Sequence, residues 1–381
     1  MKILVNAIPL KGLLTGISRY VRQLYTELEK LPGVSVSYFD GLRVTDRMPE
    51  QADSMTWAIS RKAVWRLPDS VVFAARCIHQ LLFEANLRRL CGRGSFDLYH
   101  ETTFFPAALY SIPQILTIYD LSLLKYASSH PRERIWFYNF FRKRRMPFAS
   151  RILTISDFIK GEINSSLGIS PEFVDTVHLA PAPLFSKRNT GEVNAALRRL
   201  ALPQEFLLFV GSLEPRKNLP KLIEAMKIAR SNIPLVLAGW EGWGDKEWLQ
   251  TLKGSPLRDR IFITGHVSEE DLAFLYSAAK ALVYPSLYEG FGLPVLEAMA
   301  CGCPVICSKV ASLPEVAGDA ALFIDPADAE GLAQKIELIV NDQEVRKKYE
   351  ILGKARANYF SWKKNAENTF EVFMKATQNR K

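Results

Sequence analysis

The 381-residue sequence is poor in cysteine and contains no long hydrophobic run. Its five cysteines are an odd number that gives no disulfide framework, and no histidine stands at zinc-site spacing from Cys301, Cys303 or Cys307. We expect these three cysteines to pack as small buried residues in a reducing cytoplasm. No apolar run approaches the roughly 20 residues of a membrane span, and Met1–Ala7 is too short for a signal peptide and is typical of a buried strand. We therefore expect neither a disulfide-stapled secreted fold nor a membrane-spanning helix.

The net positive charge comes from the first half of the chain. Residues 1–190 hold 25 Lys and Arg against 16 Asp and Glu, a net +9, whereas residues 191–381 hold 24 of each kind. Much of the excess lies in two stretches that also carry aromatic residues, Trp57–Arg93 and Trp136–Arg145. Such helices suit the surface of an anionic membrane, and a solvated face with core aromatics explains them equally well. Nucleic acid is disfavoured as a partner because no nucleic-acid-binding motif accompanies the charge.

Short apolar runs alternate with helical stretches from end to end, which predicts an α/β protein with two doubly wound, parallel-sheet domains. We expect domain boundaries that give residues 1–185, 186–360 and a last helix in 361–381, because Ala180–Pro183 is rich in proline. The expected strands are Ile3–Ala7, Val34–Phe39, Leu98–His100, Gln114–Ile118, Ile152–Ile155, Val174–Leu179, Phe206–Val210, Leu235–Ala238, Ile261–Thr264, Ala281–Tyr284, Val305–Cys307 and Ala321–Ile324.

The most informative stretch is Pro285–Ile306. It places glycines on both sides of Phe291 and a proline at the start of a small-residue helix, with Glu289 before that helix and Glu297 within it. A glycine loop that leads into a helix N-terminus is an anion site. Ligands of open α/β sheets lie beyond the carboxyl ends of strands. We therefore expect this stretch and Gly211–Lys217, which each follow a strand, to face a cleft between the domains.

These segments resemble the donor-binding segments of retaining glycosyltransferases of family 4, which have the GT-B fold and use nucleotide-diphosphate sugars. Phe209–Asn218 is similar to the strand and loop that hold the diphosphate in that family. The resemblance continues through Gly265–Ser268, Leu313–Val316 and Gly318–Ala321 and covers about the whole chain, more strongly in the second half. It implies two Rossmann-like domains with an interdomain cleft and a last helix that crosses back onto the first domain.

The resemblance also implies roles for individual residues. Arg216 and Lys217 would stabilise the leaving diphosphate, Glu289 would lie beside the donor sugar, and Glu297 would bind the ribose hydroxyls. No two aspartates are two residues apart, so the Asp-x-Asp metal signature is missing and we expect no metal and no cofactor. Further donor contacts are expected at close-approach glycines, backbone N–H groups and the nucleobase segment, namely Gly16, Gly211, Phe291, Gly292, Leu293 and Val267.

One departure from the family pattern concerns the strand Gln114–Ile118. Many members carry a histidine before an aspartate after this strand, and that histidine lies beside the donor sugar; here Tyr119 stands in its place and precedes Asp120. We expect Tyr119 and Asp120 as possible contacts of the sugar or the acceptor. A tyrosine stays neutral at pH 7, so a role that needs imidazole is in doubt. A tyrosine at this place resembles bacterial transferases that handle GDP-mannose or GDP-rhamnose. His100 ends an earlier strand, where it either faces the acceptor or is a core histidine.

The resulting hypothesis is a retaining, metal-independent transferase that moves mannose or D-rhamnose from a GDP-sugar to a lipid-linked saccharide of O-antigen or a related polysaccharide. We expect it to be cytoplasmic and peripheral on the inner face of the cytoplasmic membrane. The alternatives are a UDP-sugar-dependent family 4 transferase, a nucleotide-sugar epimerase on the same fold and a non-catalytic GT-B subunit. An epimerase would convert its sugar nucleotide without an acceptor.

Overall fold

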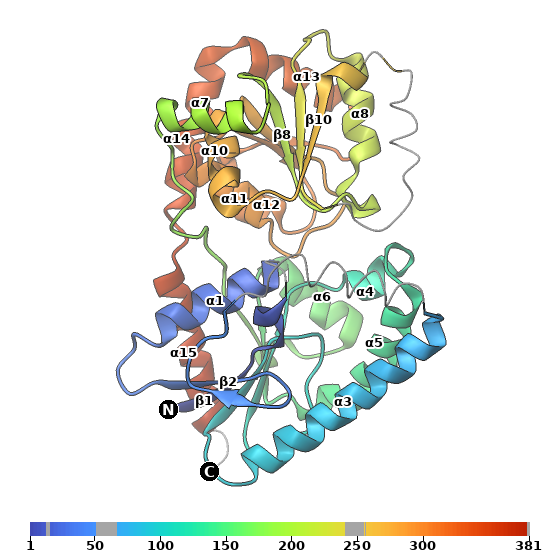
Figure 1. The fold of residues 1–381 in the computed structure, drawn as a ribbon, viewed down its shortest axis with the longest axis vertical. Helices are drawn as coiled ribbons and strands as arrows, with labels where there is room; N and C mark the ends of the chain where they lie inside the picture. The colour runs from blue at the N-terminus through green and yellow to red at the C-terminus, as the bar shows by residue number, and fades with distance from the viewer. Residues whose placement is uncertain (13–15, 51–66, 241–254, 256, 379–381) are drawn as a thin grey trace. The chain divides into compact units, whose positions relative to one another are not determined.

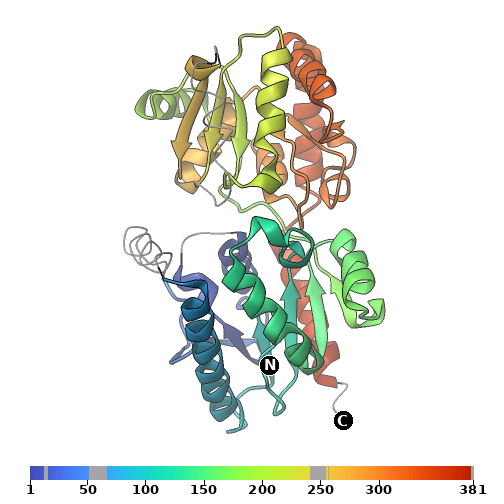
Figure 2. The ribbon, with the colours of Figure 1, turned by 90° about the vertical axis from the view of Figure 1, so that its right-hand side faces the viewer.

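The computed structural model describes residues 1–12, 16–50, 67–240, 255 and 257–378 (Figure 1). The chain divides into two compact units. The first comprises Met1–Leu179 together with Trp362–Lys381, and the second comprises Ala180–Ser361. Each unit contains its own, largely parallel sheet with helices on either side of it (Figures 1 and 2).

The sheet of the first unit has seven strands in the order β3-β2-β1-β4-β5-β6-β7. All neighbours pair in parallel except β2 and β3, which pair antiparallel. Strands β4 and β5 are buried along their whole length, as expected of parallel strands covered on both faces. The strands are β1 (Lys2–Asn6), β2 (Ser35–Phe39), β3 (Val44–Thr45), β4 (Leu98–Glu101), β5 (Gln114–Ile118), β6 (Arg151–Thr154) and β7 (Val174–Thr176).

The helices of the first unit include one from the far end of the chain. This helix, α15 (Trp362–Gln378), packs against α1 (Gly16–Leu28), and the Nδ2 of Asn365 donates to the carbonyl of His178 at 2.7 Å. The amphipathic pattern of α1 buries Tyr20, Val21 and Leu24. The remaining described helices are α3 (Asp69–Cys91), α4 (Ser122–Lys125), α5 (Arg132–Arg145), α6 (Asp157–Leu167) and the 3-10 turns Ile8–Lys11, Ala127–Ser129, Met146–Phe148 and Pro171–Phe173.

The sheet of the second unit has six strands in the order β10-β9-β8-β11-β12-β13, all parallel. They are β8 (Leu207–Val210), β9 (Leu235–Ala238), β10 (Ile261–Gly265), β11 (Ala281–Tyr284), β12 (Val305–Ser308) and β13 (Leu322–Ile324). The described helices are α7 (Thr190–Arg199), α8 (Leu219–Ile228), α10 (Glu269–Ala278), α11 (Leu293–Ala300), α12 (Leu313–Ala317), α13 (Ala329–Asn341), α14 (Gln343–Ala357) and the 3-10 turns Pro215–Lys217, Arg258–Arg260 and Gly318–Ala320.

Every strand expected from the sequence is present, and each of its ends lies within three residues of the expected position. The short edge strand β3 was not expected, because two residues carry no detectable alternation. The first unit ends at Leu179 and not at residue 185. The reason is that the segment after Leu179 packs on the second unit, where the ring of Phe185 meets that of Tyr276 at 5.9 Å.

Two further expectations concern cysteines and membrane spans. Cys301, Cys303 and Cys307 are free and buried, and burial raises the pKa of the Cys301 thiol to about 12, as expected of packing residues. Every helix in the described part of the chain is too short or too polar to cross a bilayer.

Candidate active site

The strand order of the second unit brings two distant loops to one edge of its sheet. The order reverses between β8 and β11, which pair in parallel, so the loops after both strands start side by side. Ligands of open α/β sheets bind at such a reversal point. The loop after β8 carries Arg216, whose carbonyl accepts a hydrogen bond from the N–H of Leu287 in the loop after β11 at 2.9 Å. This edge of the second unit is the candidate active site.

An ion-pair cluster occupies this edge. Lys217 Nζ donates to Glu289 Oε1 at 2.5 Å, and Arg216 Nη1 donates to Glu289 Oε2 at 3.1 Å. Arg216 Nη2 also donates to Glu214 Oε1 at 2.6 Å, while Nη1 donates to the Tyr288 carbonyl at 2.7 Å. The sequence predicted Arg216, Lys217 and Glu289 as functional residues without predicting that they touch. Two cations and two carboxylates meet here, so the cluster is neutral as a whole.

Burial and charge act against each other in this cluster. Only 7% of Glu289 and 6% of Lys217 are exposed to solvent. Burial by itself would raise the pKa of Glu289, but the charges of Lys217 and Arg216 outweigh it and lower that pKa to about 2. Burial likewise lowers the pKa of the Lys217 ammonium, and the Glu289 charge opposes that shift. Glu289 is therefore a carboxylate at neutral pH.

Tyr284 completes the cluster and was missed by the sequence reasoning. Lys217 Nζ donates to its hydroxyl at 2.6 Å and lies 4.9 Å from the centre of its ring. Burial, followed by the nearby charge of Glu289, raises the pKa of Tyr284 well above its usual value, so the phenol stays neutral. Its position as the last residue of β11 at the carboxyl edge of the sheet was the signal that could have identified it.

The glycine loop before α11 is held in one shape by its neighbours. Gly292 has a φ of +103°, and a Cβ there would lie 2.7 Å from Leu313 Cδ2, so this position requires glycine. The fully buried Ser312 hydroxyl donates to the carbonyls of Glu289 at 3.0 Å and Phe291 at 2.9 Å. Ser312 is a second residue that the sequence reasoning missed, and no local pattern marks it.

Helix α11 begins with Leu293 and carries the second predicted glutamate. Glu297 is only 1% exposed, and its Oε2 accepts a hydrogen bond from the Tyr276 hydroxyl at 3.1 Å. Phe291 is also buried, with its ring edge-on to that of Phe360 at 5.9 Å. Glu297 is thus held in place in the second unit and is not a glutamate on a solvent-exposed helix surface.

Two glycines let the ends of β8 and β9 approach closely. Gly211 has a φ of +147°, and the Lys217 side chain runs across it, with Cε 3.4 Å from where a Cβ would stand. A Cβ on Gly239 would lie 1.9 Å from the Gly211 carbonyl oxygen. At the ends of β9 and β10 the rings of Trp240 and His266 stack at 4.7 Å, and the partly exposed Val267 follows.

In the first unit, Gly16 is the exposed first residue of α1. Among the described residues no atom lies within 4 Å of where its Cβ would stand, so packing within the described fold does not require a glycine there.

Tyr119 and Asp120 follow β5 and contact their own unit. The Tyr119 hydroxyl donates to the Thr102 carbonyl at 3.1 Å, and burial raises the pKa of this phenol well above its usual value. Asp120 Oδ1 accepts from the N–H of Ser122, the first residue of α4, at 2.8 Å. The Tyr119 phenol therefore stays neutral, as expected of a tyrosine at this place.

His100 is a core residue, the second of the two roles left open for it by the sequence. It is fully buried, with Nδ1 2.7 Å from the Tyr25 hydroxyl and Nε2 2.7 Å from Thr117 Oγ1. Burial lowers its pKa to about 3, so the ring is neutral. The ring also meets that of Phe373 in α15 at 5.3 Å, which shows that His100 anchors the returning helix.

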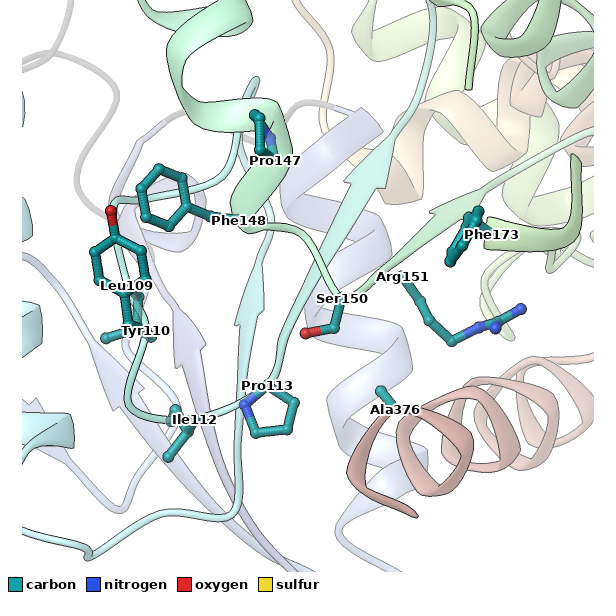
Figure 3. A pocket seen from close by; sticks show the side chains of 10 residues that line it. All are labelled: Leu109, Tyr110, Ile112, Pro113, Pro147, Phe148, Ser150, Arg151, Phe173 and Ala376. Carbon is teal, nitrogen blue, oxygen red and sulfur yellow. The ribbon is translucent and has the colours of Figure 1, made fainter. Parts of the chain in front are cut away.

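A hollow of about 570 Å³ lies elsewhere on the first unit (Figure 3). Pro113 and Ser150, which immediately precede β5 and β6, line it together with Tyr110, Phe148 and Arg151. It therefore opens at the amino ends of the strands. Ligands of α/β sheets bind at the opposite edge, so this hollow is not a candidate donor site.

Comparison with known proteins agrees with this geometry. Residues 197–356 match the family described as Glycosyl transferases group 1, and residues 14–180 match Glycosyltransferase Family 4. The chain is 33% identical to the O-antigen chain mannosyltransferase B of Escherichia coli, over 98% of this chain and 99% of that protein. It is 28% identical to the MMP alpha-(1->4)-mannosyltransferase of Mycolicibacterium hassiacum, over 76% and 73% of the two chains.

Solved structures share the fold. Sucrose-phosphate synthase from Thermosynechococcus elongatus superposes with a TM-score of 0.74 at 21% identity and covers 99% of each chain. Anabaena HepE, solved with UDP and glucose, superposes with a TM-score of 0.73 at 17% identity over 98% of this chain and 100% of its own. With its two parallel-sheet units and its near full-length relative, the chain belongs to glycosyltransferase family 4 and has the GT-B fold.

Proposed function

We propose that the protein is a retaining hexosyltransferase that moves mannose, or alternatively D-rhamnose, from a GDP-sugar to a lipid-linked saccharide in the synthesis of O-antigen or a related polysaccharide. The observation that carries this proposal is the 33% identity, over almost the complete length of both chains, to an O-antigen chain mannosyltransferase. The mannosyltransferase from Mycolicibacterium hassiacum supports the same sugar.

Arg216 and Lys217 are proposed to stabilise the leaving group. In the transfer, the bond from the anomeric carbon to the β-phosphate oxygen breaks and its electron pair stays on that oxygen. The acceptor hydroxyl oxygen bonds to the anomeric carbon on the same face, and its proton passes to the departing phosphate. The phosphate thus gains negative charge before it is protonated, and fixed cations in a buried site stabilise such charge most strongly.

Glu289 is proposed to act through its charge. Its pKa of about 2 keeps it ionised, so it can stabilise positive charge that develops at the anomeric carbon. Each of its two oxygens accepts a hydrogen bond from a cation, at 2.5 Å from Lys217 and 3.1 Å from Arg216. Such pairing lowers the nucleophilicity of both oxygens, which favours an electrostatic role over a covalent one. It also makes Glu289 and the leaving phosphate share the same two cations.

The nucleotide is proposed to contact Glu297 through its ribose and the segment at Val267 through its base. Glu297 is fixed by Tyr276, and a fixed carboxylate suits two neighbouring hydroxyls. No metal is proposed, because the sequence has no Asp-x-Asp pair and both Glu214 and Glu289 are already paired with cations.

The acceptor is proposed to be presented at the inner face of the cytoplasmic membrane. The net +9 of residues 1–190 supports this location, because anionic headgroups attract basic surfaces.

The test is calorimetric titration of purified protein with GDP and UDP separately in the presence of EDTA, followed by product analysis with GDP-mannose. The expected result is tight binding of GDP, weak binding of UDP, and mannosyl transfer that needs an acceptor. Preference for UDP would redirect the donor to a UDP-sugar. Conversion of the sugar nucleotide without acceptor would establish an epimerase, and binding of neither nucleotide would favour a non-catalytic subunit.

A further inference from the structure

The outer face of α3 is apolar and exposed. Seven residues make up this face, and no charged side chain interrupts it: Val71, Ala74, Ala75, Ile78, Leu81, Leu82 and Ala85. Ile78 is 60% exposed and Leu82 is 61% exposed. Their spacing of three and four residues places all seven on one side of the helix, along about 21 Å at 1.5 Å per residue. A row of large apolar side chains in water marks an interaction surface.

The opposite side of α3 holds the helix to the first unit. Phe83, Leu87 and Cys91 are buried in a core cluster. Glu84 is 1% exposed and pairs with Arg145 of α5 at 2.7 and 2.9 Å. The inner side of the helix is thus packed against the first unit. This packing fixes the orientation of α3 about its own axis and leaves the outer face exposed.

Helix α5 lies beside α3 and carries exposed aromatic residues (Figures 1 and 2). The ring of Phe73 in α3 meets those of Trp136 at 6.4 Å and Phe140 at 6.0 Å in α5. Trp136 is 46% exposed and Phe140 is 44% exposed, and the Arg144 guanidinium lies 4.3 Å from the centre of the Phe140 ring. Exposed aromatic rings beside arginine are typical of proteins that rest at a membrane interface.

Exposed cations far outnumber exposed acids on α3 and α5. Within α3 and α5, which the structure describes in full, Asp69 is the one exposed acidic residue, since Glu84 and Glu133 are buried. The exposed cations of these helices and of the turn after α3 are Arg76, Arg88, Arg89, Arg93, Arg132, Lys143 and Arg144.

We infer that the outer face of α3, together with Trp136 and Phe140, binds the surface of a bilayer that contains anionic phospholipid. The apolar side chains enter the boundary between headgroups and acyl chains, and the cations meet the headgroups. This assignment rests on the membrane location proposed above and names the surface that makes the contact. A second copy of the chain fits less well, because it would bring the same excess of cations and almost no acids to pair with them.

The test is sedimentation of the full-length protein with vesicles of phosphatidylethanolamine and phosphatidylglycerol, and with vesicles of phosphatidylcholine alone. We compare the wild type with Ile78→Ser/Leu82→Ser and with Arg88→Ala/Arg89→Ala. The control is Ile228→Ser/Ile351→Ser, which removes apolar side chains that are 45% and 60% exposed in the second unit. Thermal unfolding of each variant verifies that it is folded.

We expect the wild type and the control to bind the anionic vesicles and to bind phosphatidylcholine weakly. Each α3 variant should bind anionic vesicles at least about tenfold more weakly than the wild type does. Raised salt should weaken the binding of the wild type to these vesicles. If the wild type binds neither vesicle, the proposed membrane location fails. If the wild type binds and both α3 variants bind equally well, the location stands and this surface assignment is wrong. A dimer that the Ile78/Leu82 variant disrupts, without effect on vesicle binding, would reassign the surface to a second copy.

Discussion

Replacing Glu289 with glutamine tests the ion-pair cluster of the candidate active site directly. The substitution keeps the shape of the side chain and removes its charge. Arg216 retains Glu214 at 2.6 Å as a charged partner, whereas Lys217, 6% exposed, retains the neutral Tyr284 hydroxyl. Most of the loss of stability therefore comes from Lys217, because its buried ammonium loses its carboxylate partner at 2.5 Å.

Removing one partner of a buried ion pair typically costs about 3–5 kcal/mol. We expect Glu289→Gln to lower the free energy of unfolding by about 3 kcal/mol, the low end of this range, because the amide oxygen still accepts one hydrogen bond. For a unit of this size the loss corresponds to a Tm lower by about 6–12 °C. Scanning calorimetry measures it, and the transition of the second unit is the one expected to move.

The same variant should also lose activity at temperatures at which it is still folded. If Glu289 stabilises charge in the transition state, kcat should fall by about 10²–10³-fold below the unfolding temperature, with little change in KM. The control is Glu162→Gln in the first unit. Glu162 is also buried, but its partner Lys125 is 39% exposed, so water can solvate the unpaired ammonium and activity should persist.

A second substitution separates the two effects. Adding Lys217→Met to Glu289→Gln should recover much of the lost stability, because no uncompensated buried charge remains on that side of the cluster. It should not restore turnover. A Tm of Glu289→Gln equal to that of the wild type, or normal kcat, would refute the electrostatic account of this site.

Three further predictions concern separate parts of the molecule. Arg216→Ala should lower kcat/KM for the sugar nucleotide about 100-fold or more in steady-state assays, and undiminished turnover would remove Arg216 from leaving-group stabilisation. The folded pKa of His100, about 3, lies below its unfolded value of 6.5, so its contribution is complete above pH 6.5 and declines as the pH falls toward 3. At pH 5 the free energy of unfolding, measured by denaturant titration, should be lower by about 2 kcal/mol because of His100. His100→Gln should flatten the dependence of stability on pH between pH 7 and 5, and an unchanged slope would contradict this assignment. Gly292→Ala should lower stability by about 2 kcal/mol or more, because its φ is +103° and its Cβ would lie 2.7 Å from Leu313, and a wild-type Tm would show that the loop adapts.

The strands were predictable because most of them are short apolar runs that are buried as expected. β8 and β11 are examples, since all four residues of each are buried. The two-residue strand β3 was not predictable, because it forms only by pairing with β2. The expected end of the first domain, residue 185, lies after the observed end at Leu179. This difference also depends on a distant contact, because Phe185 packs on Tyr276 of the second unit.

For the candidate site, local patterns identified residues but not their partners. Arg216 and Glu289 stand out by their flanking glycines and prolines, yet they are 73 positions apart and their pairing depends on strand order. Tyr284 and Ser312 escaped notice because a strand end and a loop serine resemble many others. His100 was left open between two roles, and only its burial and its two hydrogen bonds assign it to the core.

By itself the sequence determined the alternation of strands and helices, the division into two α/β units and the glycine loops, because these depend on local periodicity and backbone freedom. The tertiary structure decided which charges neutralise one another at the edge of the second sheet. It also decided which side of α3 faces water, because that helix carries apolar side chains on more than one side and its contacts with the core select the buried one. The physical reason is the same in both cases: the free energy of a charge or an apolar side chain depends on its neighbours in space, and those come from distant parts of the chain.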